Sequence, residues 1–240
     1  MAGHSKWAKI KRDKGANDAK RGAIFTKLGN GIAIAVKSGG KDPDMNPTLA
    51  LAIEKAKQSN MPNANIERAI KRGAGELGGA QVEEVMYEGY GPAGVAVLIE
   101  CATDNTNRTL TFVKTAFTKN GGNLAESGAV SYLFDRKGVI TIKKTGDDDS
   151  DQLTAIEAGA SDIADSDDSW IVYTELQDLG KVRDTLKSEG FTVTDATASY
   201  EPKATMLIDD EEKQQKVMKL MDALDELDDV VETYTNFDIA

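Results

Sequence analysis

The sequence predicts an α+β protein, with an N-terminal three-helix domain followed by two ferredoxin-like α+β domains, one inserted in the other. Three observations lead to this fold class. Apolar residues recur at helical spacing up to Gly73, strand-forming residues dominate after Ala80, and a glycine-rich segment separates the two patterns. Domains commonly comprise about 100–200 residues, so a chain of 240 residues is long for a single core and suggests two or three domains. We expect these domains to comprise residues 1–80, residues 81–133 with 203–240, and the inserted residues 134–202.

Three short helices are expected before the glycine-rich segment. The first, Ala19–Lys37, contains two internal glycines that cost about 1 kcal/mol each relative to alanine, so this helix needs tertiary support. The second begins at Asn46 and Pro47, a capping side chain followed by proline at the first helical position. The third begins near Pro62 and ends at Gly73. The apolar positions expected to form their shared core are Phe25, Leu28, Ile32, Val36, Leu49, Ala52, Ile53, Ala56, Ile66, Ala69 and Ile70.

The strands and helices expected after residue 80 are more than one ferredoxin-like unit contains, and their number is close to that of two such units. The strands predicted from β-branched and aromatic residues are Val82–Tyr87, Val95–Cys101, Gly138–Lys144, Trp170–Thr174, Phe191–Thr197, Ala204–Ile208 and, closing the chain, Val230–Thr235. The predicted helices are Thr106–Lys119, Gln152–Ala158, Leu176–Ser188 and Asp209–Asp228. Inward positions are Leu110, Val113 and Phe117 in the first of these helices, and Val217, Leu220, Met221, Leu224 and Leu227 in the last.

The charge of the chain is divided between its two ends. The whole sequence has a net charge of −11. Residues 1–80 contain 15 Lys and Arg against seven Asp and Glu, a net charge of +8, so the remaining 160 residues carry −19. A basic segment on an otherwise acidic protein indicates an electrostatic binding site for a polyanion at one end of the chain.

Several classes of chemistry are disfavoured. The lone histidine, His4, and the lone cysteine, Cys101, cannot build a His/Cys metal cluster. A hydrolytic triad with a histidine base would have to use His4, near the N-terminus, in a segment where nothing is expected to fix the imidazole. One cysteine also rules out an internal disulfide and fits a reducing compartment. No apolar run approaches the roughly 20 residues of a membrane span, and the basic N-terminus lacks the apolar stretch of a secretory signal. We therefore expect a cytoplasmic, non-enzymatic protein with no cofactor, metal, membrane or small-molecule substrate.

Two motif-like segments have simpler explanations. Residues 89–94, GYGPAG, match the dinucleotide-binding pattern G-x-G-x-x-G, but a strand rather than a helix is expected to follow, and Pro92 lacks an amide donor. A hairpin turn is therefore favoured. The acidic run Asp147–Asp151 lacks the glycine and glutamate that an EF-hand requires at its sixth and twelfth positions, so we expect a solvated loop there. Asp165, Asp167 and Asp168 are interpreted in the same way.

Residues 1–18 show no periodicity and are expected to form a basic N-terminal arm. This arm has a different character, because it places an aromatic side chain, Trp7, among cations in a segment poor in other apolar residues. Lys and Arg bind phosphates and release counterions, and an exposed tryptophan can stack on an unpaired base. The alternative is a solvated arm with Trp7 packed onto the helices. The candidate nucleic-acid-binding residues are Lys6, Trp7, Lys9, Lys11, Arg12, Lys14, Lys20, Arg21 and Lys27, with a further patch at Lys71 and Arg72.

Short motifs spread over the first 140 residues resemble those of the YebC/PmpR family. They are MAGHSKW at 1–7, KRG at 20–22, FTKL at 25–28, NMP at 60–62, NIERAI at 65–70, YEGYGP at 87–92, TDNTNRT at 103–109, GGNL at 121–124 and FDRKG at 134–138. The resemblance implies a helical N-terminal domain with two α+β domains and a role in DNA-binding transcriptional regulation. The resemblance also implies a link to translation. Mitochondrial relatives act as translational activators, and bacterial relatives are associated with ribosomes and with sequences that are difficult to translate, such as consecutive prolines.

Two functions therefore stay open at this point. The first is a DNA-binding transcriptional regulator that acts through the basic arm and first helix. The second is a translation factor that binds ribosomal or transfer RNA, and with it the ribosome, because no base-reading pattern stands out and an arm with a helical bundle can recognise shape and charge. A small-ligand sensor in the α+β domains has only fold-level analogy behind it.

Overall fold

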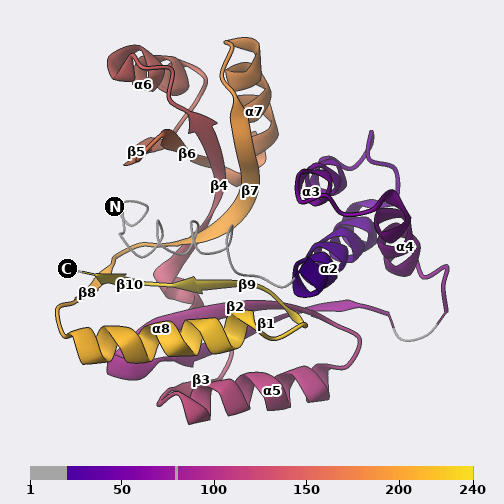
Figure 1. Cartoon of the computed structure of the whole chain (residues 1–240), viewed down its shortest axis with the longest axis vertical. Coiled ribbons are helices and arrows are strands. Elements are labelled where there is room, and N and C mark those ends of the chain that lie inside the picture. Colours follow the sequence, from indigo (N-terminus) through magenta and orange to yellow (C-terminus); the bar gives the residue numbers. More distant parts are fainter. Residues whose placement is uncertain (1–20, 79–80, 240) are drawn as a thin grey trace. The chain divides into compact units, whose positions relative to one another are not determined.

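The structure is a computed structural model that describes residues 21–78 and 81–239. Its first part is a group of three helices: α2 (Arg21–Gly39), α3 (Pro47–Gln58) and α4 (Asn63–Gly73) (Figure 1). The predicted cap of α3 is confirmed, because Oδ1 of Asn46 accepts the amide of Leu49 at 3.1 Å. Nδ2 of the same residue donates to the carbonyl of Ala35 at 2.7 Å, which ties the start of α3 to α2.

The predicted apolar faces of these helices meet in one core. Its buried members include Ile32, Val36 and Leu49, and Phe25 and Leu28 pack against them. α4 crosses α2 closely at Gly73, where a β-carbon would lie 2.5 Å from the carbonyl oxygen of Ala33. Only glycine fits at this crossing, so the residue that ends α4 also sets the approach of the two helices.

The first α+β domain contains a four-stranded antiparallel sheet in the order β3-β1-β2-β9. Its strands are β1 (Glu83–Tyr90), β2 (Ala96–Thr103), β3 (Asn123–Ala125) and β9 (Val230–Thr235). Helices α5 (Thr106–Lys119) and α8 (Glu211–Asp225) contact one another and cover the same face of the sheet (Figure 1). A short parallel pair, β8 (Met206–Ile208) and β10 (Phe237–Ile239), completes this domain.

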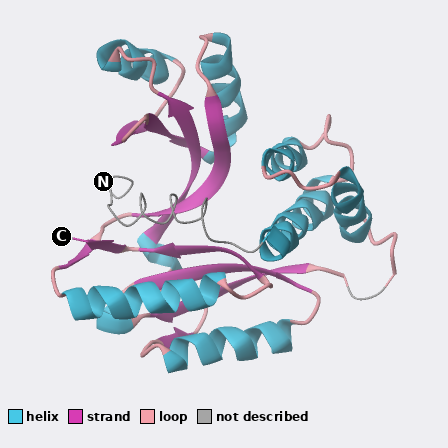
Figure 2. Ribbon diagram, viewed as in Figure 1, coloured by secondary structure: helices cyan, strands magenta, loops and turns pink. Residues whose placement is uncertain are grey.

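The second α+β domain lies between β3 and β8 in the sequence. It runs β4 (Phe134–Lys143), α6 (Asp148–Glu157), β5 (Asp162–Ser166), β6 (Ser169–Glu175), α7 (Leu179–Ser188) and β7 (Val193–Pro202). Its antiparallel sheet has the order β5-β6-β4-β7, with helices packed against it (Figure 2). The βαββαβ sequence of elements and this strand order are those of a ferredoxin-like domain.

The chain divides into two compact units. Within the described residues, 134–205 form one unit, and 21–133 together with 206–239 form the other. The helical part therefore packs with the first α+β domain: α2 contacts β2 and β9, and Ala33 shares a small core with Val82 and Ala102. This packing supplies the tertiary support that the two glycines inside α2 require. The boundaries at 80/81, 133/134 and 202/203 stay a prediction.

Several local predictions are confirmed. The bounds of α5 and β9 are those expected from the sequence, and the stripe on α8 is core at Val217, Leu220, Met221 and Leu224. The segment GYGPAG makes a turn: a 3-10 helix, η2 (Pro92–Gly94), links β1 to β2, and the amide of Gly91 donates to the carbonyl of Val95 at 2.7 Å.

Other predictions are wrong. Leu110 on α5 is 39 % exposed instead of facing inward, because the inward face runs through Thr109, Val113, Ala116 and Phe117. β9 does not close the chain, since β10 follows it. The predicted helix at 176–188 begins as a 3-10 turn, η4 (Leu176–Asp178), and another, η3 (Ser131–Leu133), precedes β4. β3, β5 and β10 are absent from the prediction.

The acidic run at 147–151 is the start of a helix instead of a solvated loop. Asp147 caps α6 by accepting the amide of Ser150, and three acidic residues occupy its first turn, where the helix dipole favours negative charge. Asp151 is 2 % exposed and accepts hydrogen bonds from Thr145 and from Nε1 of Trp170. Asp165 and Asp167 belong to the β5–β6 hairpin, in which Lys144 pairs with Asp165 at 2.9 Å.

Candidate nucleic-acid interface

Four of the predicted cations lie on the described helices. Arg21 is the first residue of α2, and its side chain is outside the described part. Lys27 is half-buried on α2, and its positive charge acts on Cys101 of β2. Lys71 and Arg72 occupy the last turn of α4, where cations oppose the negative end of the helix dipole. The remaining candidates, Lys6, Trp7, Lys9, Lys11, Arg12, Lys14 and Lys20, lie outside the described residues.

Arg72 is oriented by a buried amide. Its Nη2 donates to Oδ1 of Asn30 on α2, and Asn30 is 4 % exposed. Nδ2 of Asn30 donates in turn to the carbonyls of Ala102 at 3.4 Å and Asp228 at 3.2 Å. The chain of contacts runs from α4 through α2 to the sheet of the first α+β domain. Arg72 therefore has a structural partner that its position in the sequence does not reveal.

The electrostatic surroundings of Arg72 are mixed. Burial lowers the pKa of its guanidinium, the negative charge of Asp104 raises it, and the positive charge of Arg68 lowers it. An arginine stays protonated under such shifts, because its ordinary pKa lies far above neutral pH. The pair Arg68 and Arg72 thus presents two cations spaced four residues apart on one face of α4.

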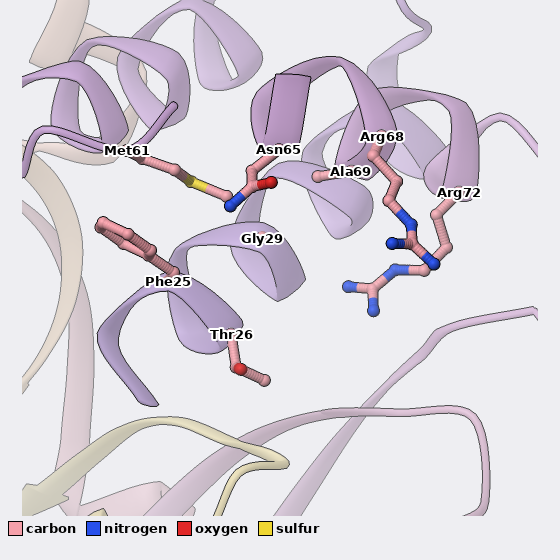
Figure 3. Close-up of a pocket in the computed structure, with 8 residues that line it drawn as sticks. All are labelled: Phe25, Thr26, Gly29, Met61, Asn65, Arg68, Ala69 and Arg72. Atoms are coloured by element: carbon pink, nitrogen blue, oxygen red, sulfur yellow. The ribbon is translucent and has the colours of Figure 1, made fainter. Parts of the chain in front are cut away.

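These arginines line a surface pocket between α2 and α4 with a volume of about 360 Å³. Its wall is made by Phe25, Thr26, Gly29, Met61, Asn65, Arg68, Ala69 and Arg72. Figure 3 shows Phe25 and Met61 together at one end and the two guanidinium groups beside one another at the other, with Asn65 between them. The pocket therefore combines an apolar end with a cationic end.

Two other cations of the helical part are engaged within the protein. Nζ of Lys41 pairs with Glu76 at 2.7 Å, and Nζ of Lys37 donates to the carbonyl of Val82 at 3.2 Å. Lys41 thus links the loop after α2 to the segment after α4, and Lys37 links the end of α2 to the start of the α+β domain. Their charges are partly offset by these partners, whereas Arg68 and Lys71 on α4 are exposed.

Cys101 cannot serve as a nucleophile in this fold. The side chain is fully buried on β2, and burial, with the nearby charges of Asp229 and Glu100, raises the pKa of its thiol to about 12. A thiol with that pKa is almost entirely protonated at neutral pH, so it supplies no thiolate. Across the described residues, no group of three His, Cys, Asp or Glu side chains has the geometry of a metal site. His4 lies outside those residues.

Comparison with known proteins identifies the family. The family model described as the TACO1/YebC protein N-terminal domain matches residues 5–76, and the one described as the TACO1/YebC second and third domain matches residues 82–237. The two matches together span nearly the whole sequence. The chain belongs to the TACO1/YebC family. The resemblance seen in the short motifs is thereby confirmed.

Full-length relatives of this TACO1/YebC chain bear regulatory names. A "probable transcriptional regulatory protein" of Mycobacterium sp. is 54% identical over 241 residues, covering 100% of this chain and 96% of the relative. Proteins of the same name from Persephonella marina and Dictyoglomus turgidum are 51% and 50% identical, each across 100% of this chain and 97% and 96% of their own length. These names place the TACO1/YebC chain among proteins regarded as regulators.

A solved TACO1/YebC-like structure shares the fold. The crystal structure of a conserved hypothetical protein from Aquifex aeolicus superposes with a TM-score of 0.87 at 49% identity, covering 93% of this chain and 92% of that one. In the described part of the TACO1/YebC chain, no helix is both long and apolar enough to cross a membrane.

Of the eight residues that line the pocket in this TACO1/YebC chain, sequence reasoning named Arg72 alone as a site residue. It missed the other seven in that role: Phe25 and Met61 at the apolar end, Asn65 and Arg68 on α4, and Thr26, Gly29 and Ala69. The periodicity predicts Phe25 as a core residue, and it does pack against the core while also lining the pocket. A usable signal exists in the spacing of Asn65, Arg68 and Arg72, which places all three on one face of a helix. No signal in the neighbouring sequence indicates a pocket on this face, because the pocket depends on how α2 crosses α4.

Proposed function

We propose that this chain is a non-enzymatic regulator of gene expression that binds nucleic acid through its basic N-terminal arm and first helix, as a cytoplasmic DNA-binding transcriptional regulator. The observation that carries the proposal is the separation of charge, +8 in residues 1–80 against −19 in the remainder. A duplex carries one negative charge per roughly 1.7 Å of its axis, so such a protein is attracted at its basic end and repelled elsewhere. The regulatory names of the full-length relatives support the same conclusion.

The roles of the residues follow from their chemistry. The lysines and arginines of the arm and of α2 contact phosphates, with Lys71 and Arg72 as a second patch. Such contacts position the protein without reading sequence. Trp7 stacks on a base or wedges between bases. The acidic α+β domains limit indiscriminate coating of the nucleic acid, because they repel neighbouring phosphates.

The salt dependence of binding tests this mechanism. About six phosphate contacts give a slope near −5 when the logarithm of the binding constant for duplex DNA is plotted against the logarithm of salt concentration. We expect such a slope from fluorescence anisotropy with the wild-type protein. A slope flatter than about −2 would contradict binding by several phosphate contacts.

A pair of triple variants tests where the contacts lie. Replacing Lys9, Lys11 and Arg12 with alanine should weaken binding severalfold or more and flatten the slope by about 3. The matched control replaces Lys213, Lys216 and Lys219, three exposed lysines on the acidic helix α8, and changes the net charge by the same amount. The control should bind nearly as the wild type does. Equal effects of the two triple variants would show that only the total charge matters.

A second candidate is a translation factor that binds ribosomal or transfer RNA. It is favoured by the resemblance to translational activators and by the form of the α2–α4 pocket, which is better suited to an exposed base than to a duplex edge. Sedimentation of a cell lysate through sucrose separates the two functions. Co-sedimentation with ribosomes that is lost after ribonuclease treatment supports the translation factor. Retention on chromosomal DNA that survives ribonuclease supports the transcriptional regulator.

A further inference from the structure

The pocket between α2 and α4 offers two kinds of contact at opposite ends. Phe25 and Met61 form an apolar end, and Arg68 and Arg72 form a cationic end, with the amide of Asn65 between them (Figure 3). An aromatic ring and a thioether suit the face of a flat heterocycle. Paired guanidinium groups suit a phosphate, which accepts two parallel hydrogen bonds. A volume of about 360 Å³ falls in the range of small-ligand pockets, roughly 300–1,000 Å³.

In the part of the chain that the structure describes, neither arginine of the cationic end forms an ion pair, although the negative charge of Asp104 acts on Arg72. Within the described residues, Nε of Arg72 is buried and has no hydrogen-bond acceptor. Its neighbour Arg68 carries a like charge, and the structure shows no ion pair for Arg68 in the described part of the chain. Since Asn30 already fixes Nη2 of Arg72, the rest of that guanidinium is held in place for a second partner. Two adjacent cations with an unsatisfied donor are the expected surroundings of an anionic group.

Gly29 keeps the wall of this pocket open. A β-carbon at that position would lie 3.7 Å from Cε of Met61 and 3.8 Å from Cβ of Ala69, which is ordinary van der Waals contact. Close packing therefore does not require glycine there, although glycine weakens the interior of a helix. A larger side chain at position 29 would project among the lining residues. At Gly31, two residues along the same helix, a β-carbon would have nothing within 4 Å, and this glycine does not line the pocket.

We infer that this pocket binds one unpaired nucleotide of a nucleic-acid strand, with the base against Phe25 and Met61 and a phosphate on Arg68 and Arg72. The inference rests on the proposed function and adds to it a preference for a single-stranded segment. A base within a duplex is stacked on both faces, so it cannot enter a pocket without being flipped out. The pocket also lies on the two helices, α2 and α4, that carry the basic residues Lys27 and Lys71, so a bound strand can continue along them.

The test uses the full-length protein and two fluorescent DNA probes of equal length, an oligothymidylate single strand and a blunt duplex. Gly29→Leu fills the pocket, and Gly31→Leu makes the same change at a neighbouring site with open space. We expect Gly29→Leu to weaken single-strand binding by roughly tenfold, the loss that corresponds to one stacked base. Duplex binding by the same variant should stay within about twofold of wild type, because phosphate contacts dominate it. Gly31→Leu should leave both affinities unchanged.

A second pair of variants covers the case in which Gly29→Leu fails to fold. Arg68→Ala removes an exposed cation of the pocket, and Lys57→Ala removes an exposed cation from α3 in the same helical part. Arg68→Ala should weaken single-strand binding severalfold more than Lys57→Ala does, whereas the two should weaken duplex binding alike.

The outcomes separate this inference from the proposed function. If the wild type binds neither probe, the proposed function itself fails. If it binds both probes and Gly29→Leu matches Gly31→Leu on the single strand, the pocket holds no nucleotide. Equal losses on single strand and duplex, for either pocket variant, also overturn the inference, because they indicate general electrostatics or misfolding in place of a pocketed base.

Discussion

Nη2 of Arg72 on α4 donates a hydrogen bond to Oδ1 of Asn30 on α2, and the side chain of Asn30 is buried. Nδ2 of Asn30 points to the other side and donates to the carbonyls of Ala102 and Asp228. A single amide thus joins both helices of the candidate interface to the sheet beside them. Only a side chain with a donor and an acceptor at its tip can make all of these contacts.

Replacing Asn30 with alanine should destabilise the protein by about 1–3 kcal/mol, because the buried carbonyls and the Arg72 guanidinium lose their partner. The free energy of unfolding in urea measures this loss. Asn107→Ala is the matched control: Asn107 is exposed on α5, and its replacement should change the free energy by less than about 0.5 kcal/mol. Equal stability of the two variants would mean that the Asn30 contacts contribute nothing net.

Gly73→Ala should also destabilise the helical part. The added methyl group would lie 2.5 Å from the carbonyl oxygen of Ala33 and 2.9 Å from Cβ of Val36, so α4 must move away from α2. Overpacking of this kind typically costs about 1–3 kcal/mol. Gly31→Ala places the same methyl group in open space and should stabilise α2 by up to about 1 kcal/mol. Thermal unfolding of both variants gives the comparison, and a Gly73→Ala protein as stable as wild type would refute the close crossing.

The sequence was sufficient where a structural signal is local. Asn46 followed by Pro47 defines the start of α3, and the bounds of α5 and β9 follow from capping and side-chain periodicity within a dozen residues. Each of these signals acts between neighbours in the chain, so one sequence suffices to read it. The fold class followed from the order of such segments.

The sequence was insufficient where the partner is distant. β3 and β10 are only three residues long and are defined by the strands beside them. Three residues are too few to show an alternating pattern from which a strand could be predicted. The carboxylate of Glu88 is buried, and it accepts hydrogen bonds from the amides of Gly128, Val130 and Ser131, about 40 residues away in the sequence. These bonds compensate for the loss of water around the charge. For the candidate site, composition indicated Lys71 and Arg72, but the contact with Asn30 and the pocket depend on the crossing of two helices.

The single cysteine provides a probe of the first α+β domain. Cys101 is fully buried and its pKa is raised to about 12, chiefly by burial, whereas a cysteine in an unfolded chain titrates near 8.5. Ellman's reagent should therefore leave the native protein unmodified near pH 8 and modify one thiol per chain in denaturant. The rate of modification at rising urea concentration should follow global unfolding. Rapid reaction of the native protein would show that β2 is accessible.

Asp151 in the inserted domain is the residue with the clearest expected dependence on pH. Burial acts to raise the pKa of its carboxyl, but hydrogen bonds from the hydroxyl and amide of Thr145 and from the Trp170 indole outweigh burial, so the pKa is lowered. A carboxyl whose folded pKa lies below its unfolded value, about 3.9, stabilises the fold fully above that value. The contribution is lost as the pH falls through the folded pKa.

Asp151→Asn should consequently reduce the free energy of unfolding by about 1–3 kcal/mol near neutral pH, since the amide cannot accept all three hydrogen bonds on anionic oxygens. The difference from wild type should shrink as the pH falls below about 4, because the carboxyl of the unfolded wild-type chain takes up a proton there before that of the folded protein does. Urea unfolding followed by tryptophan fluorescence at several pH values measures the difference. Asp148→Asn, at an exposed position in the same helical turn, should cost less than about 0.5 kcal/mol. A deficit for Asp151→Asn that stays constant down to about pH 2 would show that the negative charge of Asp151 does not stabilise the domain, because only a charged group loses its contribution on protonation.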